Sequence, residues 1–195
     1  MNAETLGRFG MVISLFFAGM WAIAASADPN WIFGTMSLSD MGISSVAITS
    51  VFFNVGCVVT GILLLIFFYL LAKEDTGGGV VGAYIASSSG IFLSFVGIFN
   101  LSTGAYHYFF ATTFGILATM GVILYTMRDM NKDRGIQSAI TFIMLCLGMF
   151  AVMRFEFELW EPIVVILGLV WLFLFSIGLF KPTFFWRVIK ELIEE

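Results

Sequence analysis

Charged residues are scarce in this sequence. Asp, Glu, Lys and Arg make up 11% of its 195 residues, whereas about 25% is usual in soluble domains. Hydrophobic residues reach 60% and the mean hydropathy is +1.02, so a soluble globular fold is excluded because it could not bury this much apolar surface. The net charge of −4 provides no basic face for phosphates, which excludes nucleic acid as a partner. The 23 Phe and 5 Trp exclude a disordered chain.

Histidine and cysteine are also rare. One histidine cannot supply the His-rich ligand sets that catalytic zinc prefers, and no phosphate-binding or dinucleotide-binding motif is present. We therefore predict neither a metal nor a cofactor. Cys57 and Cys146 both fall within apolar runs, and we interpret them as packing residues rather than a disulfide.

Long uncharged apolar runs dominate what remains. Each can form the helix of about 20 residues that crosses a bilayer. The predicted fold class is an all-α membrane protein, a bundle of six transmembrane helices in residues 1–180. The predicted spans are about 9–27, 45–72, 80–100, 105–127, 138–153 and 162–180.

The first run has an alternative interpretation. Arg8, an apolar stretch and then Ala25-Ser26-Ala27 are also typical of a secretory signal peptide with a small-residue cleavage site. Removal of this segment would leave five spans and place the termini on opposite sides of the membrane.

Basic residues are distributed unequally between the two sides. With six spans, Arg154 stands alone on one side, and the other eight basic residues share the opposite side, which is typical of the cytoplasmic face. We therefore predict a multi-pass protein of the cell membrane with both termini in the cytoplasm. Residues 181–195 place apolar and charged residues on opposite faces at helical spacing, which predicts an amphipathic helix at the cytoplasmic interface.

Small and polar residues recur at steps of three or four in three of the spans. Because lipid tails are as apolar as Leu, such stripes mark surfaces where helices pack together or line a cavity. We expect the second, third and fourth spans to pack closely, with His107 facing the bundle. Membrane lipids are the expected partners, and a homo-oligomer is left open. The stripes are Ala47, Ser50, Asn54, Cys57 and Gly61; Ala83, Ser87, Gly90, Ser94 and Gly97; and Gly104, His107, Ala111, Gly115 and Ala118.

The candidate site residues lie on the predicted outer side. His107 could act as a general base or acid, held by Asp40 or Glu158. Asp40 could equally well cap the start of a helix. Arg154 could pair with Glu158 four residues further on. The predicted ligand-binding set is Ser39, Asp40, Asn54, Asn100, His107, Glu156 and Glu158.

Short motifs in this region resemble a known family. They are Ser39-Asp40-Met41-Gly42, Phe53-Asn54, Gly61, Gly90, Val96-Gly97-Ile98-Phe99 and His107. With the six-span topology, they resemble the prokaryotic membrane family catalogued as domain of unknown function 998, which is similar in layout to the eukaryotic Frag/DRAM/Sfk group. Met41 departs from the Leu of the family's Ser-Asp-Leu-Gly, and Asn100 stands in place of the Pro of its Phe-Pro pair. The resemblance implies roles for Asp40, Asn54 and His107 but no reaction, and the eukaryotic group's association with lipid handling is a weak analogy.

Three functions fit these patterns. The first is binding of a lipid or small amphiphile in an outward-facing pocket between helices. The second is an intramembrane enzyme acting on lipid head groups, which requires His107 within direct or one-water reach of Asp40, Glu156 or Glu158. The third is a transporter or channel for small solutes, but no ionisable residue lies midway along the spans.

Overall fold

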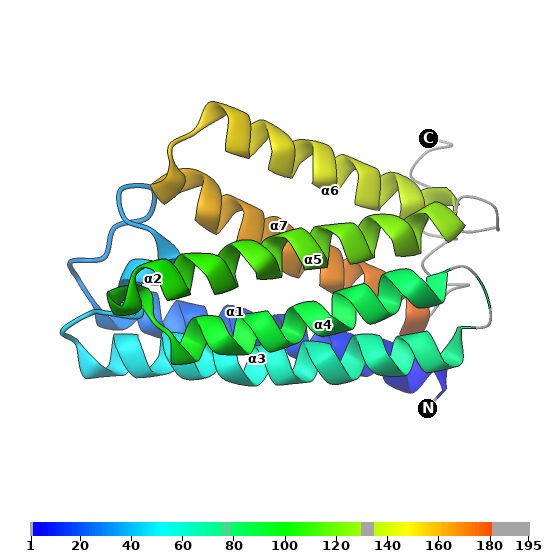
Figure 1. Cartoon of the computed structure of the whole chain (residues 1–195), viewed down its shortest axis with the longest axis horizontal. Helices are drawn as coiled ribbons and strands as arrows, with labels where there is room; N and C mark the ends of the chain where they lie inside the picture. Colours follow the sequence, from blue (N-terminus) through cyan, green and yellow to red (C-terminus); the bar gives the residue numbers. More distant parts are fainter. Residues whose placement is uncertain (1, 76, 78, 130–134, 181–195) are drawn as a thin grey trace.

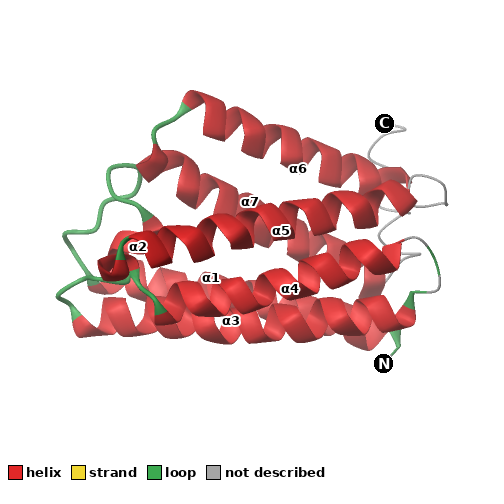
Figure 2. Cartoon of the chain, viewed as in Figure 1, coloured by secondary structure: helices red, strands yellow, loops and turns green. Residues whose placement is uncertain are grey.

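The computed structural model describes residues 2–75, 77, 79–129 and 135–180, without the side chains of residues 128, 129 and 136. The predicted amphipathic tail at 181–195 lies outside this part of the chain. All named elements of the described part are helical (Figure 2). They are α1 (Ala3–Ala27), the one-turn α2 (Leu38–Met41), α3 (Ala47–Glu74), α4 (Gly79–Ile98), the 3-10 turn η1 (Leu101–Thr103), α5 (Ala105–Asp129), α6 (Gly135–Arg154) and α7 (Phe157–Phe180).

Six of these helices, all found within the described residues, are long and apolar enough to cross a membrane. The predicted fold class, an all-α membrane protein with six transmembrane helices, is therefore confirmed. The long helices run alternately in opposite directions, so that α1 begins and α7 ends at the same end of the bundle (Figure 1). The opposite end carries α2, η1 and the turn between α6 and α7, and it is called the α2 end below.

Neighbouring helices form a ring around the bundle. Helix α4 packs between α3 and α5, α1 packs between α3 and α7, and α6 packs on α7 and more sparsely on α5. Glycines allow the closest approaches: a Cβ at Gly90 would lie 2.4 Å from the carbonyl oxygen of Gly61, and one at Gly61 would lie 2.4 Å from that of Gly90. The predicted close packing of the second, third and fourth spans is thus observed.

The stripe predicted for the fourth span is only partly right. His107 is buried, but a Cβ at Gly104 or Gly115 would have no neighbouring atom within 4 Å. Helix α5 instead approaches α4 through Gly121, where a Cβ would lie 2.4 Å from the backbone nitrogen of Ala86. Gly121 lies toward the end of α5 that is far from α2.

Two helix starts differ from the predictions. Helix α1 begins at Ala3 rather than at residue 9, and Asn2 caps it by accepting a hydrogen bond from the Thr5 N–H at 2.8 Å. Glu4 and Arg8 pair along its exposed first turns. Helix α7 begins at Phe157 rather than at residue 162, so Pro162 lies inside it. A proline near the polar end of a membrane helix removes one backbone hydrogen bond without ending the helix.

The side chains of α2 are part of the hydrophobic core. Leu38 and Met41 are fully buried and pack with Phe53, Cys57 and other residues of α1, α3 and α4. Cys57 is thus a packing residue as predicted, whereas Cys146 is exposed on the outside of α6, and both are free thiols. The burial of α2 places its polar residues at a fixed position over the ends of α5 and α7.

Candidate functional site

A capping box gives α2 its shape. The Ser37 hydroxyl accepts a hydrogen bond from the Asp40 N–H at 3.2 Å, and the Asp40 carboxylate accepts from the N–H and the hydroxyl of Ser37, both at 2.8 Å. Trp31 donates its indole N–H to the Ser37 carbonyl at 2.9 Å. A single helical turn is not stable in isolation, so these contacts are needed to keep α2 folded. Asp40 therefore acts as a capping residue, but of α2 rather than of the second membrane span.

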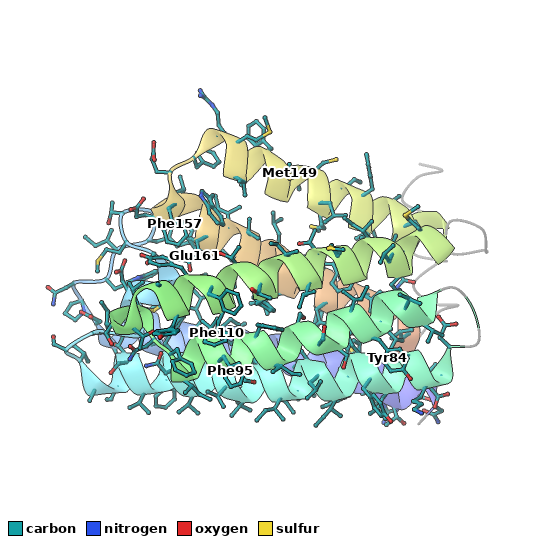
Figure 3. The ribbon with its side chains drawn as sticks, in the orientation of Figure 1. Tyr84, Phe95, Phe110, Met149, Phe157 and Glu161 are labelled. Carbon is teal, nitrogen blue, oxygen red and sulfur yellow. The ribbon has the colours of Figure 1, made fainter. Side chains whose placement is uncertain are left out.

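A chain of hydrogen bonds joins α2 to α5 and α7. The His107 Nε2 atom, near the start of α5, lies 3.0 Å from the Ser39 hydroxyl. That hydroxyl lies 2.9 Å from one carboxylate oxygen of Glu161, on α7, and the second oxygen accepts from the backbone N–H of Leu38 at 2.7 Å. The other ring nitrogen, Nδ1 of His107, lies 2.8 Å from the backbone carbonyl oxygen of Phe99. We call Ser39, His107 and Glu161 the polar network; Figure 3 shows Glu161 near the start of α7.

Two members of the polar network, Ser39 and His107, are closed to solvent, and Glu161 is half-buried. Ser39 is 4% exposed and His107 is 2% exposed. Because a carbonyl oxygen can only accept, Nδ1 of His107 carries a hydrogen and donates it to Phe99. The side that faces Ser39 is therefore Nε2, which fixes the orientation of the ring.

A depression lies at the α2–α3 turn, which follows Ser39 along the chain. It is open, has a volume of about 490 Å³, and is lined by polar groups next to apolar side chains of α3. The Gly42 carbonyl, at the C-cap of α2, accepts hydrogen bonds from the side-chain amides of Asn54 at 2.9 Å and Asn100 at 3.4 Å. The depression is lined by Gly42, Ile43, Ser44, Ser50, Val51, Asn54, Val55, Asn100 and Ser102.

Asp28 stabilises the loop that leads into this region. Its carboxylate accepts hydrogen bonds from the Ser44 hydroxyl at 2.5 Å and from the Asn30 backbone N–H at 2.9 Å. These bonds, the one from Ser44 first, hold the pKa of Asp28 below its ordinary value. Asp28 thus ties the end of α1 to the α2–α3 turn.

The predicted site residues fall into four groups. Ser39 and His107 meet in the polar network, and Asn54 and Asn100 meet at the depression. Asp40 serves the capping box. Glu156 is exposed and Glu158 half-buried, and neither makes a side-chain hydrogen bond among the described residues. The predicted Arg154–Glu158 pair is not found in that part either, because α6 ends at Arg154 and α7 begins at Phe157, so the two do not share a helix.

Glu161 is the site residue that the sequence prediction missed. The prediction ended the outer turn at Pro162 and took Glu156 and Glu158 as the relevant carboxylates. In the structure α7 begins earlier, and Glu161 lies one turn further along the helix than Glu158, at the level of Ser39. The available signal was its position next to the apolar run, since a carboxylate at that depth requires a polar partner.

No group of three or more His, Cys, Asp or Glu side chains could hold a metal ion within the residues that the structure describes. A carboxylate, a hydroxyl and an imidazole do come together, but they bond to one another. The arrangement can hold and transfer protons, and the neighbouring depression can accept a polar group.

A family model described as "Protein of unknown function (DUF998)" matches residues 11–180. The chain belongs to this DUF998 family. The family predicted from the motifs around Asp40, Asn54 and His107 is thereby confirmed. No curated protein and no solved structure matches the chain. In this DUF998 protein, the matched region contains the whole polar network and every residue that lines the depression.

Proposed function

We propose that this protein binds a membrane lipid or another small amphiphile in the depression at the α2 end. The observation that carries the proposal is the pairing of two kinds of surface. Amide and hydroxyl groups of Asn54, Asn100 and Ser102 line the depression, together with the apolar side chains of Val51 and Val55 on α3. A polar head would contact the first group, and an acyl chain would lie along the second.

The size and exposure of the depression suit such a ligand. Small-molecule sites have volumes of about 300–1,000 Å³, and this depression has about 490 Å³. Val51 is 54% exposed and Val55 is 45% exposed, so these side chains of a membrane helix face the lipid. The side-chain oxygen of Asn54, a residue that lines the depression, is buried with no partner among the described residues.

The distribution of basic residues supports an outward orientation of this site. Arg8, Lys73 and the basic residues of the other loops at their end of the bundle contrast with Arg154 alone at the α2 end. By the positive-inside rule, the α2 end faces away from the cytoplasm, and both termini lie on the cytoplasmic side. The ligand would therefore come from the outer leaflet of the cell membrane.

Head-group chemistry at His107 is a less well supported function. The distance of 3.0 Å between Ser39 and His107 does fit a nucleophile and its base. Both side chains are buried, however, and neither lines the depression. Neither ring nitrogen of His107 has Asp40, Glu156 or Glu158 as its partner, and Glu161 is reached only through Ser39. Binding therefore fits the geometry better than acid/base catalysis.

The test fills the depression without removing any hydrogen bond. Val55→Trp places an indole over the lining, and Ile62→Trp is the matched control because Ile62 is 47% exposed and lies two turns further along the same face of α3. After purification in mild detergent, native mass spectrometry measures the lipid retained per protein. We expect wild type and Ile62→Trp to retain lipid and Val55→Trp to lose at least about nine-tenths of it, roughly a tenfold loss of affinity. Equal retention by both variants would refute the proposal.

A further inference from the structure

We infer that Ser39, His107 and Glu161 form a binding site for one proton, and that this proton fastens α2 to the ends of α5 and α7. The inference rests on the hydrogen-bond geometry alone and does not depend on the proposed amphiphile site. The bound species is inferred to be a proton because the contacts require one more hydrogen than the side chains otherwise supply.

Two contacts in the network each need one hydrogen. The first joins Nε2 of His107 to the Ser39 hydroxyl oxygen at 3.0 Å, and the second joins that oxygen to Glu161 at 2.9 Å. Ser39 has a single hydroxyl hydrogen and can fill only one of them. The hydrogen on Nδ1 is already committed to the Phe99 carbonyl, and the second oxygen of Glu161 is occupied by the Leu38 N–H. A second hydrogen must therefore come from a proton bound to His107 or to Glu161.

The bound proton has two alternative positions. In one form His107 is an imidazolium that donates to Ser39, and Ser39 donates to the Glu161 carboxylate. In the other form Glu161 is a carboxylic acid that donates to Ser39, and Ser39 donates to neutral His107. Moving one hydrogen across each contact converts the first form into the second, and the pair has no net charge in either. Loss of the proton leaves two acceptors facing each other across one contact.

The surrounding charges favour retention of this proton. Asp40 follows Ser39 on α2, Glu158 precedes Glu161 by one turn on α7, and Asp28 lies at the end of α1. The other titratable groups on the surrounding helices are the buried thiol of Cys57 on α3 and the exposed phenols of Tyr106 and Tyr108 on α5. The chain that follows α4 provides the Phe99 carbonyl. The described basic side chain at this end is Arg154 of α6, which is exposed. Among the described residues at the α2 end, negative groups therefore outnumber positive ones, which favours the neutral protonated pair over the deprotonated pair with its charge of −1.

The proton determines how firmly α2 is held. Glu161 bonds α2 twice, at the Leu38 N–H and at the Ser39 hydroxyl, and His107 bonds it once. When the proton leaves, the single Ser39 hydrogen can serve only Glu161 or His107, so α2 loses one of its attachments. A rise in pH is therefore expected to loosen α2, whereas a fall in pH is expected to keep it in place.

His107 is the sole histidine of the chain, so its ring nitrogens can be observed without assignment by mutation. We would label histidine with ¹⁵N and record the ring signals from about pH 5 to about pH 10, the range over which histidines and shifted carboxylates titrate. In the wild type, we expect the Nε2 signal to change in a single-proton step, while Nδ1 remains protonated. An Nε2 signal that stays constant over this range would refute the inference.

Glu161→Gln provides the discriminating variant. The glutamine amide can donate to Ser39 and still accept from Leu38, so it imitates the protonated form permanently. We expect the step in the Nε2 signal to disappear in Glu161→Gln and to remain in the control Glu158→Gln, whose side chain makes no hydrogen bond among the described residues. If the step persisted unchanged in Glu161→Gln, a histidine titrating alone would explain it and the shared proton would be refuted.

The attachment of α2 is measured separately at Trp31, which donates to the Ser37 carbonyl just before α2. Fluorotryptophan labelling, with Trp31→Phe to identify the signal, reports this contact. We expect the Trp31 signal to shift at the same pH as Nε2 in the wild type, and not to shift in Glu161→Gln. A wild-type Trp31 signal that does not follow Nε2 would refute the fastening role. Both measurements use protein without added lipid, so their failure is distinguishable from failure of the amphiphile proposal.

Discussion

Ser39→Ala is the most direct test of how much the polar network contributes to stability. The substitution removes one oxygen atom and with it the two contacts to His107 and Glu161. Interhelical hydrogen bonds within membranes contribute about 0.6 kcal/mol on average and about 1.7 kcal/mol at most, so two of them give roughly 1.2–3.4 kcal/mol. The partners that remain, His107 and Glu161, are both ionisable and His107 is buried, which places the loss toward the upper end, at about 2–3 kcal/mol.

The control for this prediction is Ser88→Ala on α4. The Ser88 hydroxyl donates to the Ile85 carbonyl within its own helix, so its removal breaks no contact between helices. We expect a change of less than about 0.5 kcal/mol, which is usual for substitutions away from interhelical contacts. Unfolding by sodium dodecyl sulfate in mixed micelles, followed by tryptophan fluorescence, measures both variants. Equal stability of Ser39→Ala and Ser88→Ala would refute the view that the network fastens α2.

Two further predictions concern helix packing and pH. Gly90→Ala is expected to destabilise the bundle by about 1–3 kcal/mol, because its Cβ would lie 2.4 Å from the Gly61 carbonyl oxygen. The control Gly115→Ala, whose Cβ would have no atom within 4 Å, is expected to be neutral or to stabilise α5 by up to about 1 kcal/mol. The same detergent titration measures both variants. The lowered pKa of Asp28 gives stability that is present above the ordinary carboxyl pKa and is lost as pH falls through the lowered value. Ser44→Ala is therefore expected to reduce the midpoint of thermal unfolding near neutral pH and to match the wild type in strong acid. A lower midpoint at every pH would contradict this prediction.

The membrane helices could be predicted because charge is so unevenly distributed in the sequence. A run without Asp, Glu, Lys or Arg identifies what lies in hydrocarbon, and all six runs became helices. The ends of the helices were less predictable, since hydrogen bonding continues beyond the hydrocarbon. Glu4 and Arg8 extend α1 outward, and α7 begins five residues before Pro162.

The site was predictable only in part. Asn54 and His107 were recognisable because a polar side chain in an apolar helix must turn inward to find a partner. The pairing of Ser39 with Glu161 was not, because these residues are separated by 122 positions and meet only when α7 packs beside α2. Glu161 differs from Glu156 and Glu158 in sequence only by its position next to the apolar run, and its partner on α2 is visible only in the structure.

The polar network and the depression share one element, the single turn of α2. Its first N–H, from Leu38, is held by Glu161, and the carbonyl that follows it, from Gly42, is held by Asn54 and Asn100. A helix of one turn cannot adjust one end independently of the other, because the loss of a single hydrogen bond removes most of its structure. If a ligand moved Gly42, the position of Leu38 would change, and gain or loss of the proposed proton at His107 and Glu161 would in turn change the depression. By thermodynamic reciprocity, the factor by which the proton changes affinity for an amphiphile equals the factor by which the amphiphile changes affinity for the proton.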